Sequence, residues 1–126
     1  MAAKPKALVI DDDKTIVAVL TATLRAAGFQ VLAAYDAMQG FMLAQREVPA
    51  VILLDIQLPA GGGFPLLEKI TKSTKTLATP VVVITGGTDP KLEGEAKAKG
   101  ATAFVRKPVD QQALVTLIEG LVEEDD

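Results

Sequence analysis

Short apolar runs alternate with longer amphipathic segments five times along the chain. The runs predict strands over residues 7–10, 30–34, 50–54, 80–85 and 102–105. An alternation of this kind is typical of βα units around a parallel sheet. The first, third and fourth runs lack polar alternation, which indicates strands covered on both faces. The second run is the least hydrophobic and is the candidate for an edge strand.

The segments between the runs carry apolar residues at helical spacing. They predict helices over residues 14–27, 37–46, 65–73 and 90–99, and a fifth helix after the last strand. Gly28 is expected to end the first helix, and Pro65 suits the first turn of the third. The 90–99 helix has only Leu92 and alanines as apolar anchors, so we expect it to be weakly packed. The fifth helix has the clearest apolar face, made of Leu114, Leu117, Ile118, Leu121 and Val122.

The amino-acid composition limits the kinds of chemistry that the chain can perform. The chain has 126 residues, 49% of them hydrophobic but only 4% aromatic, which suits one domain with an aliphatic core. The net charge of −3 and the lack of a long basic run argue against nucleic acid as a primary partner. With no Cys and no His, disulfides, thiol catalysis and zinc sites are excluded. Any metal must be a hard cation held by oxygen, such as Mg²⁺, Mn²⁺ or Ca²⁺.

The N-terminal residues lack the apolar stretch of a signal peptide, and nowhere do 18 apolar residues follow one another. We therefore expect a soluble cytoplasmic protein without membrane insertion.

Four of the apolar runs end on chemically active side chains. These are the Asp11-Asp12-Asp13 run, Asp55, Thr85 and the lysine of Lys107-Pro108. Because parallel strands bring their carboxyl ends to one edge, where ligands bind in open α/β sheets, we expect these groups to converge. Clustered carboxylates, a hydroxyl and an ammonium suit a divalent cation and a phosphoryl group.

The three consecutive aspartates have two competing explanations. Asp13 is well placed to cap the following helix, since aspartate is a favoured capping residue. Capping does not explain three carboxylates in a row, which repel each other unless a cation compensates them. Asp11 and Asp12 are therefore metal-ligand candidates. Asp55 could form a turn before Pro59, or it could be a nucleophile that forms an acyl phosphate beside a bound cation.

These motifs together resemble the receiver domain of two-component response regulators. The resemblance covers essentially the whole chain and rests on Leu8–Asp13, Leu53–Pro59 with Gly63, Val83–Gly86 and Lys107-Pro108. It implies a single doubly wound α/β domain, flavodoxin-like and (βα)₅, with a parallel five-stranded sheet of order 2-1-3-4-5.

The resemblance also implies a role for each matching residue at the metal. Asp55 would be the phosphoacceptor. Asp12 and Asp55 would bind Mg²⁺ directly, together with the backbone carbonyl of Gln57, and Asp11 would act mainly through water. Mn²⁺ or Ca²⁺ could substitute for Mg²⁺.

Three further positions would couple the phosphoryl group to a switch. Thr85 would hydrogen-bond a phosphoryl oxygen and Lys107 would pair with it. Phe104 lies at the family's switch-aromatic position, although a simple core aromatic is the alternative. We expect Thr85, Phe104 and the 90–99 helix to move together when phosphorylation shifts the population of two states.

Three residues of this chain lie at positions that vary within the family. Gly62 stands where many members have an acidic or polar residue, so we expect a mobile loop at 61–63. Gln57 and Gly87 occupy positions that resemble the family's tuners of dephosphorylation. Gly87 offers no side chain to an attacking water, so the phosphoryl lifetime is open.

Alternative functions explain less of the chain. The Asp11-x-Asp13-x-Thr15 pattern fits the nucleophile motif of haloacid-dehalogenase-type phosphatases. That family also requires an acidic pair after the lysine, where only Asp110 follows nearby, and it leaves Asp55 unexplained. A flavodoxin-like FMN binder would need a Ser/Thr-rich loop where this chain has three aspartates. A degenerate receiver that only binds proteins is a third class, and the intact set of motif residues argues against it.

The sequence therefore predicts one receiver domain over residues 1–126, with a core over about 6–122 and an acidic tail at 123–126. It would take a phosphoryl group from a phosphohistidine on a sensor histidine kinase or histidine phosphotransfer protein. It would catalyse only its own phosphorylation and dephosphorylation, and so would not be an enzyme acting on a separate substrate. Because no DNA-binding domain follows, the expected output is an altered binding surface for a downstream protein.

Overall fold

The computed structural model describes residues 4–123, in which strands and helices alternate. The elements in chain order are β1 (Lys6–Ile10), α1 (Lys14–Ala26), β2 (Gln30–Ala34), α2 (Ala37–Glu47), β3 (Val51–Leu54), the short 3₁₀ helix η1 (Pro59–Gly61), α3 (Gly63–Lys72), β4 (Val81–Thr85), α4 (Lys91–Ala98), β5 (Ala103–Arg106) and α5 (Gln111–Glu123). The predicted acidic tail at 123–126 lies, apart from its first residue, outside the described residues.

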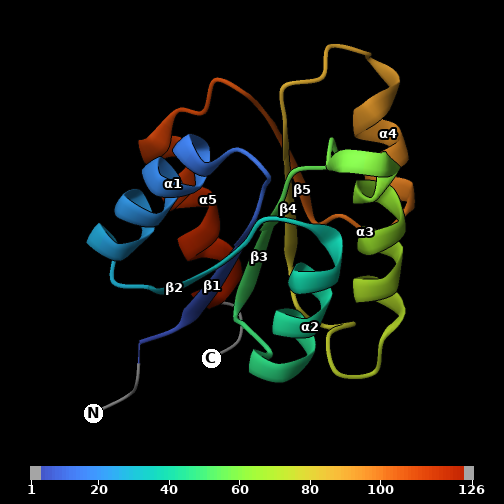
Figure 1. Cartoon of the computed structure of the whole chain (residues 1–126). Coiled ribbons are helices and arrows are strands. Elements are labelled where there is room, and N and C mark those ends of the chain that lie inside the picture. The colour runs from blue at the N-terminus through green and yellow to red at the C-terminus, as the bar shows by residue number, and fades with distance from the viewer. Residues whose placement is uncertain (1–3, 124–126) are drawn as a thin grey trace.

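All five strands pair in parallel, and the order across the sheet is β2-β1-β3-β4-β5. This confirms the predicted topology. Helices α1 and α5 cover one face of the sheet, and α2, α3 and α4 cover the other (Figure 1). The strand β2 lies at an edge and most of its residues are only half-buried, as its weaker hydrophobicity predicted.

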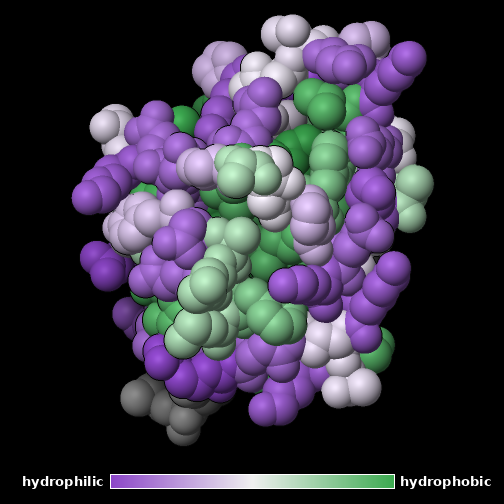
Figure 2. All heavy atoms as spheres, turned by 45° about the vertical axis from the view of Figure 1, so that its right-hand side comes forward, coloured by the Kyte–Doolittle hydropathy of each residue, from purple (hydrophilic) through white to green (hydrophobic). Residues whose placement is uncertain are grey.

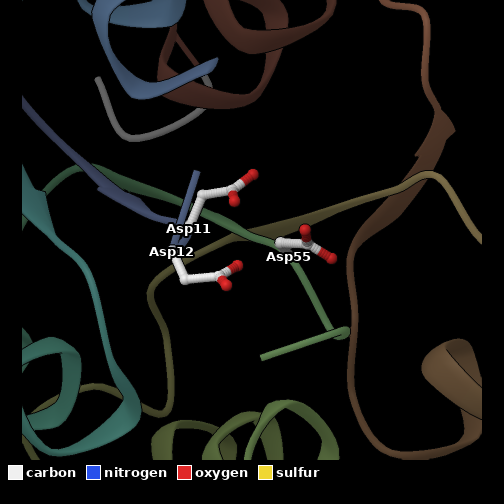
Figure 3. Close-up of side chains that lie close together, drawn as sticks. All are labelled: Asp11, Asp12 and Asp55. Carbon is white, nitrogen blue, oxygen red and sulfur yellow. The ribbon is translucent and has the colours of Figure 1, made fainter. Parts of the chain in front are cut away.

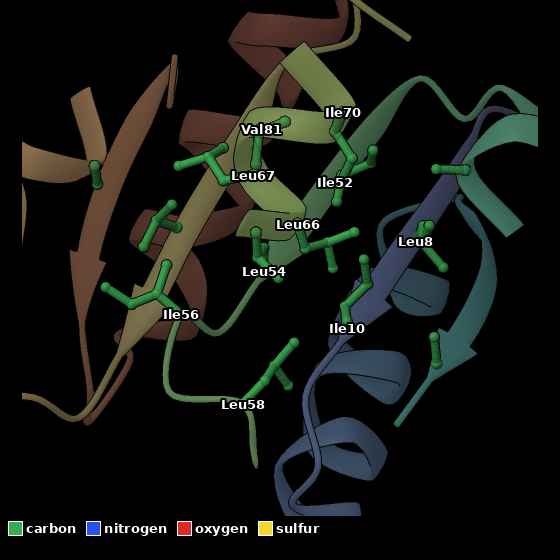
Figure 4. Close-up of a cluster of buried hydrophobic side chains, with 14 residues drawn as sticks. Leu8, Ile10, Ile52, Leu54, Ile56, Leu58, Leu66, Leu67, Ile70 and Val81 are labelled. Atoms are coloured by element: carbon green, nitrogen blue, oxygen red, sulfur yellow. The ribbon is translucent and has the colours of Figure 1, made fainter. Parts of the chain in front are cut away.

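The sheet separates two clusters of buried aliphatic side chains. Successive residues of a strand face opposite sides, so Leu8 and Ile10 pack under α2 and α3 while Ala7 and Val9 pack under α1 and α5. Figure 4 shows the first cluster, in which side chains of β1 and β3 meet those of α3. The inner strands β1, β3 and β4 are buried almost throughout, which explains their uninterrupted apolar runs.

Local signals set most helix ends. The Asp13 carboxylate accepts hydrogen bonds from the amides of Thr15 and Ile16 at the start of α1, so its predicted capping role is confirmed. Gly28 follows the end of α1 with a φ of 97°, a conformation that glycine adopts without strain.

The third helix begins earlier than predicted, at Gly63 rather than Pro65, and it ends at Lys72. Pro65 still lies in its first turn, where the missing amide costs no hydrogen bond. The early start follows from the backbone: Gly62 is already helical with φ −74° and ψ −10°, and its amide bonds to the carbonyl of Pro59. The preceding turn η1 was not predicted, and it contains Ala60 at a positive φ of 59°.

Helix α4 is the most weakly packed, as predicted. Ala96 is its only buried residue, and Leu92 is half-buried. Pro90 precedes its first residue and offers no side-chain cap, but the Asp89 carboxylate accepts from the amide of Lys91 at 2.9 Å. The peptide bond between Lys107 and Pro108, which leads from β5 toward α5, is cis.

Two features of the surface complete the description. Within residues 4–123, no helix is long and apolar enough to cross a membrane. Figure 2 shows apolar side chains gathered on the face formed by α2 and α3. The most exposed of these are Met38 and Met42 of α2, with 76% and 61% of their surface accessible, and they border a hollow that Phe41 and Lys69 also line.

Candidate functional site

The carboxyl ends of β1 and β3 place two aspartates side by side. Asp11 follows β1, and its amide donates to the carbonyl of Ala34 at 3.1 Å. Asp55 follows β3, and its amide donates to the carbonyl of Ile10 at 2.9 Å. The sheet's own hydrogen bonding therefore continues into both residues and fixes their backbones at the rim. Only 3% of Asp11 and 5% of Asp55 is accessible to solvent.

Each buried aspartate also shapes the loop that follows it. The Oδ1 atom of Asp11 accepts a hydrogen bond from the amide of Asp13 at 2.9 Å, and that of Asp55 accepts one from the amide of Gln57 at 2.8 Å. Both bonds span two residues and close a local turn. The second oxygen of each carboxylate remains directed into the site.

Asp12 completes a cluster of three carboxylates with these two residues. Figure 3 shows the three side chains lying close together. One oxygen from each of them lies within 4.8 Å of the others, and Asp12 is exposed to solvent. Asp13 turns away to cap α1 and does not join them. Oxygen ligands in this number and spacing suit a hard divalent cation.

Lys107 provides the positive charge of the site. Its Nζ donates to Oδ2 of Asp11 and to Oδ2 of Asp55, at 2.9 Å in both cases. Burial on its own would lower the pKa of the Lys107 ammonium, but the hydrogen bonds to the two carboxylates outweigh it, and the pKa is raised. Three carboxylates and one ammonium leave two negative charges, which matches the charge of one divalent cation.

Thr85 ends β4 at the same rim and is fully buried. Its hydroxyl oxygen accepts a hydrogen bond from the amide of Gly87 at 3.1 Å. The side chain of Gln57 lies over Gly86 and Gly87, the two residues that follow Thr85. A methyl group added at Gly87 would lie 2.5 Å from a methyl carbon of Leu92 and 3.0 Å from Nε2 of Gln57. Glycine at 87 therefore leaves the space that Leu92 and Gln57 occupy.

Phe104 lies on β5 and does not belong to the ionic cluster. It pairs in register with Val83 of β4, is half-buried, and packs against the core under α3 and α4. The guanidinium of Arg106 lies over its ring, with Cζ 5.1 Å from the ring centroid. We did not predict a role for Arg106, whose only signal in the sequence is a charged residue at the end of an otherwise apolar strand.

The loop at 61–63 approaches the backbone after β3. A methyl group added at Gly63 would lie only 2.0 Å from the carbonyl oxygen of Ile56, so α3 begins in close contact with that segment. One added at Gly62 would lie 3.2 Å from Cβ of Ala37 at the start of α2. The mobility expected for this loop stays a prediction.

A parallel sheet of this order with three carboxylates, a threonine and a lysine at its carboxyl edge defines a phosphoacceptor class of signalling protein. The chain belongs to the response regulator receiver domain family, whose model matches residues 7–119. It is therefore a receiver domain of two-component signal transduction. This assignment leaves the phosphatase and FMN-binding alternatives without support.

Relatives and solved structures agree with this family. The chain is 36% identical over 115 residues to the protein PilH of Pseudomonas aeruginosa. The aligned region covers 91% of this chain and 95% of PilH. It is 31% identical over 124 residues to the DNA-binding dual master transcriptional regulator RpaA of Synechocystis, and it spans 51% of that protein's length. The fold is also similar to the crystal structure of a CheY-like response regulator receiver domain protein from Methanospirillum hungatei, with a TM-score of 0.89 and 28% sequence identity. The superposition covers 96% of this chain and 95% of that chain.

Proposed function

We propose that Asp55 is the phosphoacceptor of this receiver domain. The observation that carries the proposal is the position of its Oδ2 atom, 2.9 Å from the ammonium of Lys107 and within the carboxylate cluster. Asp12 and Asp13 offer weaker candidates, because the first is exposed and the second caps a helix. Only Asp11 is similarly buried and paired, and the experiment below separates it from Asp55.

The donor would be a phosphohistidine on a sensor histidine kinase or a histidine phosphotransfer protein. A carboxylate oxygen of Asp55 attacks phosphorus, the P–N bond to the imidazole breaks, and a P–O bond forms. In the later hydrolysis, water attacks phosphorus, the P–O bond to Asp55 breaks, inorganic phosphate leaves, and the carboxylate is restored. The domain thus catalyses only its own phosphorylation and dephosphorylation, with no separate metabolite as substrate.

The residues that would hold a divalent cation are Asp11, Asp12 and Asp55, with the backbone carbonyl of Gln57. Mg²⁺ is the expected ion, with Mn²⁺ or Ca²⁺ as substitutes, and Asp11 would contact it mainly through water. A bound divalent cation offsets the repulsion between a carboxylate and an approaching phosphoryl group. The two uncompensated negative charges of the cluster support this assignment.

Lys107 and Thr85 would bind the phosphoryl group once it is on Asp55. The Lys107 ammonium already lies beside the acceptor oxygen, so it can pair with a phosphoryl oxygen after a small displacement. The buried Thr85 hydroxyl would donate to another phosphoryl oxygen and draw the following loop with it. Phe104 and the weakly packed helix α4 would then change position, as a shift between two populated states.

Gln57 and Gly87 would influence how long the phosphoryl group lasts. The exposed Gln57 side chain lies over Gly86 and Gly87, where its carboxamide can hydrogen-bond a water that approaches the site. Gly87 has no side chain of its own to do so. We propose that Gln57 sets the hydrolysis rate at this edge of the site.

We further propose that residues 1–126 act as one receiver unit in the cytoplasm, with a core over about 6–122, a range that includes the family match at 7–119. The output would be an altered surface around α4 and β5 for a downstream protein. Direct nucleic-acid binding is not part of this proposal, since the net charge is −3. The proposal does not include membrane insertion either.

The experiment is intact-mass measurement after incubation with a small-molecule phosphodonor and Mg²⁺. We expect one phosphoryl adduct on the wild type and on Asp110→Ala, a matched control that changes a helix-capping carboxylate outside the site. We expect none on Asp55→Ala. An adduct that survives in Asp55→Ala but is lost in Asp11→Ala would move the acceptor to Asp11. No adduct on the wild type, even with purified phosphorylated histidine phosphotransfer proteins, would indicate a receiver kept for binding alone.

A further inference from the structure

Arg106 makes three contacts that no role at the phosphorylation site explains. Its Nη1 donates to the carbonyl of Gly87 and its Nη2 to the carbonyl of Asp89, the latter at 3.2 Å. Its guanidinium also lies over the ring of Phe104. Within the described part of the chain, Arg106 forms no ion pair with a carboxylate. Its guanidinium therefore interacts with the backbone of a loop and with an aromatic ring.

The loop that Arg106 holds is the connection from β4 to α4. It leaves the sheet at Thr85 and reaches α4 at Lys91, beside the end of β5 (Figure 1). Gly87 is bound from both sides, since its amide donates to the Thr85 hydroxyl at 3.1 Å while its carbonyl accepts from Arg106. A movement of Thr85 therefore reaches Arg106 through a single residue.

The register of the sheet makes this connection direct. Thr85 and Arg106 are partners in the parallel pairing of β4 and β5, and the amide of Lys107 donates to the carbonyl of Thr85 at 2.8 Å. The backbone between the two strands is fixed at this point. We therefore expect a rearrangement here to involve side chains and the loop after Thr85 rather than the paired backbone.

We propose that Arg106 is a positioning residue that holds the β4–α4 loop and Phe104 in the conformation described here, and so opposes the switch. This inference rests on the proposed function. If the Thr85 hydroxyl moves toward a phosphoryl group on Asp55, the loop can follow only by withdrawing two carbonyls from the guanidinium. If the ring of Phe104 turns, it loses the cation above it. Both movements remove interactions that Arg106 provides.

Arginine suits this position better than lysine. Its planar guanidinium presents several donors in a fixed fork, so it can bond two carbonyls while it stacks on a ring. A lysine ammonium could retain the ring contact and one carbonyl. We therefore expect Arg106→Lys to keep part of the restraint and Arg106→Met, which keeps an apolar stem, to lose it.

The test uses beryllofluoride with Mg²⁺ as a probe that mimics the phosphoryl group. Its affinity is measured by titration for the wild type, Arg106→Met and Arg106→Lys, with Arg46→Met as a control for loss of an exposed arginine on α2. We expect Arg106→Met to bind the probe about threefold to tenfold more tightly than the wild type, with Arg106→Lys between them and Arg46→Met unchanged. The sign is informative, because loss of a nearby positive charge would by itself weaken binding of an anion.

Two outcomes separate failure of this inference from failure of the proposed function. A wild type that binds no probe with Mg²⁺ present contradicts the proposed function. A wild type that binds it while Arg106→Met binds equally or more weakly overturns the role of Arg106. Independently of the probe, amide hydrogen exchange at Gly87 should be faster in Arg106→Met than in the wild type. Equal exchange rates there would also overturn it.

Discussion

Lys107 Nζ lies 2.9 Å from Oδ2 of Asp55, although 52 positions separate the two residues in the chain. The same ammonium contacts Asp11 at 2.9 Å, so one cation joins the ends of β1, β3 and β5. A cation that binds the carboxylates must share them with this ammonium. We therefore expect Lys107 to compete with a bound metal ion for these carboxylates, and to pair with a phosphoryl group on Asp55.

Substitutions in the cluster should separate metal binding from phosphoryl binding. Asp12→Ala should abolish Mg²⁺ binding, because it removes the exposed carboxylate of the cluster. Lys107→Ala should bind Mg²⁺ at least as tightly as the wild type but accept a phosphoryl group more slowly. The measurements are calorimetric Mg²⁺ titration and the phosphorylation rate.

Asp13→Ala is the matched control, since it removes a neighbouring carboxylate that caps α1 instead of joining the cluster. It should lose about 1 kcal/mol of unfolding free energy and keep its Mg²⁺ affinity. Equal Mg²⁺ affinity in Asp12→Ala and the wild type would remove Asp12 from the metal site.

The pH dependence of stability should show the Lys107 ion pairs in metal-free protein. The pKa of Lys107 is raised above its ordinary value of 10.5 in the folded state, so folding favours the protonated form. This contribution is fully present below the unfolded pKa and is lost as pH rises through the folded pKa. In urea unfolding followed by circular dichroism, the difference in unfolding free energy between the wild type and Lys107→Met should stay constant at neutral pH and shrink on the alkaline side. A constant difference at every pH would contradict it.

Helix α4 should respond to a phosphoryl mimic more than helix α1. Ala96 is the only buried residue of α4, whereas α1 buries three. Amide hydrogen exchange over residues 91–98 should change when beryllofluoride and Mg²⁺ are added, and exchange over 14–26 should not. The Asp55→Ala variant with the same additions serves as the control. If exchange in α4 is the same with and without the mimic, the switch idea fails.

Two glycine substitutions should affect stability in opposite directions. Gly63→Ala should lower the free energy of unfolding by about 3 kcal/mol, because its new methyl group would lie 2.0 Å from the carbonyl oxygen of Ile56. Gly120→Ala, in α5, should raise it by about 0.5–1 kcal/mol, since nothing lies within 4 Å and alanine favours a helix. Chemical denaturation of both variants measures the difference, and similar effects from the two substitutions would contradict the packing argument.

The strands and the main site residues could be predicted because their signals are local. Buried parallel strands need continuous apolar runs, and the active side chains follow those runs directly, so the topology alone brings Asp11, Asp55 and Lys107 to one edge. The edge position of β2 also follows from its own composition.

The start of α3 and the contacts of Arg106 could not be predicted in the same way. The close approach of Gly63 to Ile56 depends on how η1 folds back, and that turn contains an alanine at a positive φ that its residue type does not favour. The Arg106 contacts depend on the path of the β4–α4 loop, which no periodicity in the sequence describes.

The division of the interior by the sheet has a consequence for how such a domain can diverge. Val9 and Ile10 are adjacent in the chain, yet they pack in different clusters that share only the backbone between them. A change of side-chain volume near Val9 must therefore be compensated by α1 or α5, and one near Ile10 by α2 or α3. The side chains of each cluster can therefore change independently of the other cluster. The whole set under α1 and α5 could be replaced together while the side chains under α4 keep their packing.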